Sequence, residues 1–158
     1  MNKIMTEQVN INIKLQRRLS VGLAAATLVV AVLFFAGSVL LNESWFAALV
    51  VQTGLRLESF VAVFATSAIV LSTGAFVISW KQRSFLVGGL LATSGVIFMI
   101  HPLTIFIMHF MKHSQMAMVH SAVIPGGPIL VVILGLGILG LGVAKGMRTA
   151  MGAVAAAR

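Results

Sequence analysis

The chain of 158 residues is 59% hydrophobic, only 9% of its residues are charged, and its mean hydropathy is +1.08. A soluble domain typically carries about 25% charged residues, so this composition excludes an ordinary soluble protein. The absence of cysteine excludes disulfides, thiolate metal sites, c-type haem and thiol redox chemistry. The net charge is +8, but the sequence has no basic stripe interleaved with aromatic residues, so nucleic-acid binding is also excluded.

Apolar runs of about twenty residues recur along the sequence, which is the length that a helix needs to cross a bilayer. In lipid the backbone hydrogen bonds must be made within the protein, so a membrane-spanning chain is helical or forms a closed barrel. Barrel strands alternate apolar and polar residues over about ten positions, whereas these runs are continuously apolar. The sequence therefore predicts an all-α integral membrane protein with a bundle of four transmembrane helices.

Residues 1–18 form a polar N-terminal segment. Its apolar residues from Val9 to Leu15 alternate with polar ones, which predicts a short extended or interfacial segment, with a poorly fixed terminus as the alternative. The first transmembrane helix is predicted over residues 19–41. Its apolar run exceeds the roughly 7–15 residues of a signal peptide, so we expect this helix to be retained.

The middle of the chain predicts three further elements. An interfacial helix is expected over residues 44–56, where Trp45 suits the membrane interface. The second and third transmembrane helices are predicted over residues 59–80 and 85–108. Pro102 lacks a backbone donor and should kink the third helix about one turn earlier.

The last transmembrane helix is predicted to be interrupted. A short interfacial helix over residues 114–124 precedes a break at Pro125–Pro128, and the membrane-spanning part follows over residues 128–144. These elements give a four-helix membrane domain over residues 19–148 and a C-terminal tail over residues 149–158.

Small residues recur at helical spacing on the third and fourth transmembrane helices. Such faces let two helix backbones approach closely, so each face is predicted to form a tight contact with another helix. The residues are Gly88, Ala92 and Gly95 on the third helix and Gly135, Gly142 and Gly146 on the fourth.

Positive charge is distributed unevenly between the two ends of this four-helix arrangement. Of the eleven lysines and arginines, only Arg56 and Lys112 would lie at the end opposite to the termini. By the positive-inside rule, both termini are predicted to be cytoplasmic, in a multi-pass protein of the cell membrane. The stretch between the third and fourth helices would then face the extracytoplasmic side.

Histidine and methionine gather in this outward stretch, residues 108–120. Imidazole and thioether groups suit copper, especially Cu(I), so His109, His113, Met116 and His120 form a candidate copper site. His109 and His113 share a helix face if the third helix continues that far. Methionine is also common filler in irregular helix packing, so a packed turn without a metal is the competing interpretation.

A b-type haem is a further alternative, with His101 and His120 as its axial ligands. His101 lies well inside the third helix, where a polar side chain usually has a role. An ordinary role would be a hydrogen bond to backbone carbonyls that Pro102 leaves free. Hydrolytic or acid–base catalysis is not expected, because the three acidic residues are predicted near the membrane surfaces: Glu7, Glu43 and Glu58.

These features predict a non-catalytic accessory subunit that packs against larger helical subunits of a hetero-oligomeric membrane complex. The outward His/Met cluster suggests a copper-dependent monooxygenase or a terminal oxidase as that complex. The chain itself is expected to hold no cofactor, with copper and haem b as the alternatives. The alternative functions are a copper-binding assembly or delivery protein and a b-type haem electron-transfer subunit. The expected partners are other membrane subunits and lipid, and not nucleic acid.

Overall fold

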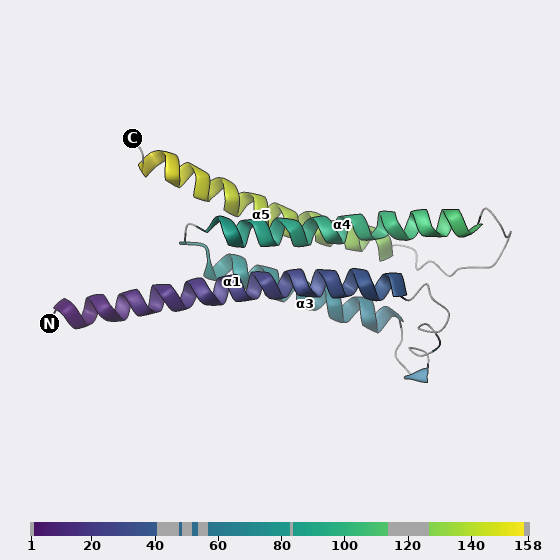
Figure 1. Ribbon diagram of the computed structural model, residues 1–158, viewed down its shortest axis with the longest axis horizontal. Coiled ribbons are helices and arrows are strands. Elements are labelled where there is room, and N and C mark those ends of the chain that lie inside the picture. Colours follow the sequence, from purple (N-terminus) through teal and green to yellow (C-terminus); the bar gives the residue numbers. More distant parts are fainter. Residues whose placement is uncertain are drawn as a thin grey trace.

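The computed structural model describes residues 2–40, 48, 52–53, 57–82, 84–113 and 127–156. This described part contains four α-helices and no strand, and each helix includes a stretch that is long and apolar enough to cross a membrane. The prediction of an all-helical fold with four helices able to span a membrane is therefore confirmed for the described residues, and this fold is consistent with a multi-pass membrane protein. The helices are α1 (Asn2–Leu40), α3 (Leu57–Ile78), α4 (Phe85–His113) and α5 (Gly127–Ala156), shown in Figure 1.

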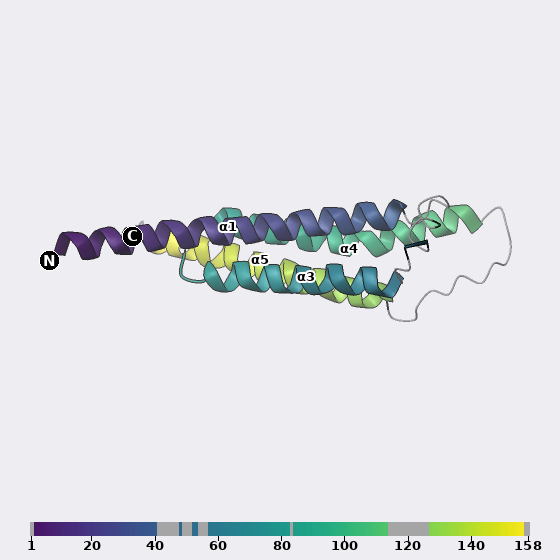
Figure 2. The same ribbon diagram turned by 90° about the horizontal axis from the view of Figure 1, so that it is seen from below.

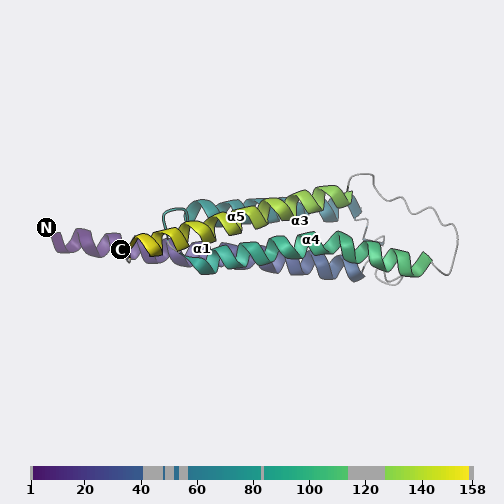
Figure 3. The ribbon, with the colours of Figure 1, turned by 90° about the horizontal axis from the view of Figure 1, so that it is seen from above.

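Successive helices run in opposite directions along one long axis (Figures 1 and 2). Both chain termini and the short α3–α4 connection therefore lie at one end of the bundle, which we call the terminal end. Helix α1 packs against α3 and α4, while α5 packs mainly against α4 and makes a smaller contact with α3. Helices α1 and α5 project past the α3–α4 connection at the terminal end, and α4 projects farthest at the opposite end (Figures 1 and 3).

The α1–α3 contact is built from small residues at helical spacing. Ala24 and Thr27 on α1 and Ser72 and Ala75 on α3 are all buried. The hydroxyls are satisfied within their own helices, since Thr27 donates to the Leu23 carbonyl at 2.9 Å and Ser72 donates to a carbonyl one turn earlier. Short side chains of this kind bring two helices close together without leaving a polar group unsatisfied in lipid.

The α4–α5 contact is closer still, because glycine backbones meet there. A Cβ atom added to Gly95 would lie 2.5 Å from the Leu139 nitrogen, and one added to Gly142 would lie 2.7 Å from the Gly88 carbonyl oxygen. No real side chain tolerates such distances, so these positions require glycine. The two small-residue faces predicted from the sequence are confirmed as contact faces, and they pack against each other.

Aromatic and apolar contacts fix how the helices are aligned. Leu23 on α1 lies beside Gly74 on α3, and the Phe34 ring lies 6.0 Å from the Phe64 ring of α3. The two helices are antiparallel, so moving one residue forward along α1 corresponds to moving about one residue backward along α3. Phe34 also lies 5.4 Å from the Phe98 ring of α4, so α1 carries the aromatic centre of the core.

The helices extend beyond several predicted ends. Helix α1 begins at Asn2, so the extended segment predicted from the alternation before residue 19 is wrong. Once a transmembrane helix is formed, each added residue gains a hydrogen bond, and this outweighs a short alternating pattern. Helix α4 continues through Pro102 to His113, and α5 continues to Ala156 instead of ending near residue 144.

Two predicted features fall outside the residues that the structure describes. The interfacial helix over residues 114–124 and the break at Pro125–Pro128 lie there, apart from the first residues of α5. Most of the interfacial helix predicted over residues 44–56 does as well. Both remain predictions.

Two alanine substitutions on α5 should have opposite effects on stability. Gly142→Ala forces the α4 and α5 backbones apart and should lower the free energy of unfolding by about 1–3 kcal/mol, as overpacking does. Gly137→Ala meets nothing within 4 Å and should raise it by up to about 1 kcal/mol through helix propensity. Thermal unfolding of the purified chain in detergent compares the two, and equal effects would refute the glycine contact.

Candidate functional site

The structure describes only part of the predicted copper site. Helix α4 continues to His113, so the condition for His109 and His113 to share a helix face is met by the backbone, although their side chains lie outside the described part. Met116 and His120 lie outside the described residues altogether. Among the described residues, no group of three or more histidine, aspartate or glutamate side chains comes together as a metal site. The copper site stays a prediction.

His101, the other predicted ligand, lies against the aromatic side chains of α1. Its ring centroid is 4.6 Å from that of Phe34 and 6.3 Å from that of Phe35. Both ring nitrogens are buried and have no hydrogen-bond partner in the described part of the chain. The expected bond to a carbonyl freed by Pro102 is therefore not formed. An unsatisfied buried polar group of this kind costs about 1–3 kcal/mol.

The best-organised polar site involves Lys145, one of the cations that the charge distribution predicts at the end of the bundle that holds the termini. Its side chain is 2% exposed, although it belongs to the apolar helix α5. The Nζ atom donates to the Ser79 carbonyl and to the Gln82 carbonyl at 2.5 Å. The last carbonyls of a helix have no partner within that helix and carry the negative end of its dipole. Both acceptor carbonyls lie in the turn that follows Ile78, the last residue of α3, so Lys145 binds α5 to this turn at the C-terminal end of α3.

Other side chains complete this site at the terminal end of the bundle. The Arg148 guanidinium stacks over the Trp80 ring, 4.4 Å from its centroid. The Thr149 hydroxyl donates to the Lys145 carbonyl at 2.9 Å. Ser84 directly precedes α4, and its hydroxyl accepts a bond from the Val87 backbone N–H at 3.5 Å. The Arg148–Trp80 stack and the two Lys145 bonds tie α5 to the segment that follows α3, while the two hydroxyl bonds are local to α5 and to the start of α4.

Gln82 differs from its neighbours in this cluster. Its backbone carbonyl accepts the Lys145 bond, but both amide atoms of its side chain are buried without a hydrogen-bond partner in the described structure. The described side chains here are cations, hydroxyls, an indole and an amide. Their chemistry is positive charge and hydrogen-bond donation, and the cluster contains none of the carboxylates that acid–base catalysis would use.

Sequence spacing contains a signal for Lys145. The buried positions of α5 recur three or four residues apart, and Lys145 continues that series. A lysine on the packing face of a helix needs acceptors, and the end of the preceding hairpin supplies them. The buried positions in this series are Val131, Gly135, Ile138, Gly142, Lys145 and Thr149.

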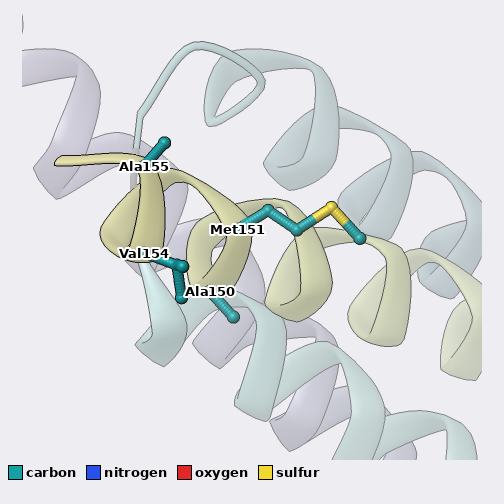
Figure 4. A pocket seen from close by; sticks show the side chains of 4 residues that line it. All are labelled: Ala150, Met151, Val154 and Ala155. Carbon is teal, nitrogen blue, oxygen red and sulfur yellow. The ribbon is translucent and has the colours of Figure 1, made fainter. Parts of the chain in front are cut away.

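A shallow hollow on the projecting end of α5 offers little chemistry. Figure 4 shows its four lining side chains, all apolar and all from one helix: Ala150, Met151, Val154 and Ala155. Ligand sites are usually enclosed by several elements and contain a few directed polar groups. This hollow has neither property.

No protein-family model matches the chain, and no curated protein or solved structure shows a match to it.

Removal of the Lys145 ammonium should destabilise the bundle. In Lys145→Met the stem is kept, but the Ser79 and Gln82 carbonyls lose the ammonium donor, so we expect the free energy of unfolding to fall by about 1–3 kcal/mol. Lys81→Met is the control, because Lys81 is exposed and should change stability by less than about 0.5 kcal/mol. Unchanged or higher stability of Lys145→Met would mean that burying the ammonium costs more than its bonds contribute.

Replacement of His101 tests whether its ring has a ligand. If it has none, His101→Phe keeps the aromatic packing, removes two unsatisfied nitrogens, and should leave the melting temperature unchanged or raised. Phe34→Ala, at a buried position of the same cluster, should instead cost about 3–5 kcal/mol. A Soret band in the wild type that disappears in His101→Phe would show that His101 holds a haem.

Proposed function

We propose that this protein is a non-catalytic accessory subunit of a multi-subunit membrane complex, in which its helices pack against those of larger subunits. The outward His/Met cluster favours an oxidoreductase of the copper-dependent monooxygenase or terminal oxidase type, because histidine and methionine are copper ligands. Catalysis is assigned to the partner subunits. This assignment is supported by a sequence without cysteine or tyrosine and with only three acidic residues.

The proposal rests on glycines that lie on helix faces exposed at the outside of the bundle. The glycines of the α4–α5 contact are required by close packing, but Gly89 on α4 and Gly137 and Gly140 on α5 are exposed, and no atom of the described residues lies within 4 Å of a Cβ added to them. Glycine inside a helix costs about 1 kcal/mol relative to alanine. Lipid gives no compensation for that cost, whereas a second helix packed closely on the glycines would.

The small internal burial of the helices is consistent with a partner. Only 17% of the most apolar stretch of α3 is buried within the chain, compared with 33% for α4. Lipid alone can cover apolar surface, so this exposure does not itself require a protein. It does leave most of each helix available for contact with other subunits.

The proposed orientation places the terminal end in the cytoplasm. Arg17, Arg18, Lys81 and Arg148 are exposed at that end, which is the distribution that the positive-inside rule associates with the cytoplasmic side. The end of α4 that carries His109 and His113 would then face outward. Metal-dependent partner subunits would meet the chain there.

If the chain is an accessory subunit, partner subunits should co-purify with it, and bulky residues in place of the exposed glycines should reduce their recovery. Mild-detergent purification of the tagged chain from its native membrane should recover fixed partners in constant proportion. The double variant Gly137→Leu, Gly140→Leu should reduce their recovery about tenfold, which corresponds to losing about 1.4 kcal/mol of association energy. The melting temperature of the isolated chain should not fall, because both positions face open space.

The control is Val70→Phe, which adds bulk on the exposed side of α3 without altering a glycine. It should leave the recovery of partners unchanged. Recovery of the wild type only as a free monomer or homo-oligomer would refute the accessory role. Full recovery of partners with the double variant would refute the part assigned to the outward glycines.

A further inference from the structure

Exposed positive side chains on three helices surround the terminal end of the bundle. They are Arg17 and Arg18 on α1, Lys81 directly after α3, and Arg148 on α5, and we call them the basic rim. None of these four side chains has an ion pair or a side-chain hydrogen bond within the described part of the chain. Arg148 alone has a partner, the Trp80 ring. Lys145 lies close by, but it is buried and its ammonium donates to the Ser79 and Gln82 carbonyls.

Helix alignment brings these cations to one level along the bundle axis. Leu23 lies beside Gly74, and α1 and α3 run antiparallel, so Arg17 lies about level with Trp80 at the end of α3. The Arg148 guanidinium is 4.4 Å from the centre of the Trp80 ring, and Lys81 follows Trp80 in the chain. The rim is therefore a band of charge at a single depth and not a patch on one helix.

The surroundings of the rim match those of a phospholipid headgroup. Trp80 is 47% exposed, and tryptophan is enriched at the depth of the headgroups. Toward the middle of the bundle, apolar side chains continue on the exposed faces of α3 and α5, with Val77 63% exposed and Val143 44% exposed. A molecule bound at the rim would thus meet positive charge at its polar end and an apolar surface along its tail.

We propose that the basic rim binds the phosphate headgroups of anionic phospholipids, with Arg148 held in position by its stacking on Trp80. Within the part of the chain that the structure describes, the cations have no acidic partner, and the negative surface of an anionic leaflet would supply the opposite charge. An acidic segment of another protein would need a compact patch, whereas these charges are spread around three helices at one depth. The proposal is independent of the accessory role, since a lone chain would bind the same lipids.

Quenching of Trp80 fluorescence tests the proposal. In a Trp45→Phe background Trp80 is the only tryptophan, and the full chain is placed in bilayers that contain brominated phosphatidylglycerol or brominated phosphatidylcholine at equal mole fraction. Anionic lipid should quench Trp80 more strongly. The preference should weaken as salt rises from about 0.05 to 0.5 M, because exposed charges are screened.

Charge removal at the rim should reduce this preference. Arg17→Gln with Arg18→Gln leaves the Trp80–Arg148 stack in place, and Lys81→Gln with Arg148→Gln removes the other pair. Each cation removed should reduce the preference roughly fivefold, the effect of one basic residue near an anionic surface. Lys112→Gln, in the last turn of α4 at the opposite end, is the matched control and should keep the full preference.

Three results would overturn the proposal. The wild type could be quenched equally by both lipids, or both rim variants could keep the wild-type preference while remaining folded by thermal unfolding. Inorganic phosphate, added at constant ionic strength, could abolish the preference, which would identify a soluble phosphate compound as the ligand in place of the lipid. Persistence of the preference in inorganic phosphate supports the lipid headgroup.

Discussion

Close approach of the α4 and α5 backbones determines much of the rest of the structure. At Gly88 and Gly142 the two helix backbones meet, since a Cβ added to Gly142 would collide with the α4 backbone and one added to Gly88 would lie only 3.0 Å from the Gly142 carbonyl oxygen. One turn further along α5, this proximity places Lys145 at the carbonyls of Ser79 and Gln82. A bulkier contact would move the ammonium away from those carbonyls, and the buried lysine would then lose both of its hydrogen bonds. The glycine contact and the Lys145 hydrogen bonds therefore depend on each other.

The Lys145 hydrogen bonds explain how α3 keeps its position although it has few contacts with α4 and α5. Along its length α3 packs on α1 through alanine and serine positions, and these contacts are short-range and carry little directional information. At its C-terminal end, the two bonds from Lys145 fix its position relative to α5. The hydrogen bonds of Lys145 are directional and lie in a poorly hydrated environment, so they specify where the hairpin sits more strictly than the apolar contacts do.

Sequence reasoning succeeded where lipid leaves the chain little choice. Continuous apolar runs can only be helices there, and glycines at helical spacing have few uses other than close packing. It failed where one residue has two plausible roles. The position of Lys145 near the predicted end of the last helix indicates a residue at the membrane surface, but its acceptors lie in the turn after α3, far away in the sequence. The alternation between Val9 and Leu15 likewise predicted an extended segment, because a local pattern does not include the helix that continues into it.

Lys145 and His101 are both polar groups inside apolar helices, and the chain treats them differently. Lys145 lies beside the turn after α3, where two backbone carbonyls accept hydrogen bonds from its ammonium. His101 lies within α4 against Phe34, where most carbonyls already bond within their own helices, and its nitrogens have no partner in the described structure. With no partner among the described residues, the buried imidazole is a cost, as are the exposed glycines Gly89, Gly137 and Gly140. The proposed assembly accounts for both, because contacts with another subunit would offset costs that this chain alone leaves uncompensated.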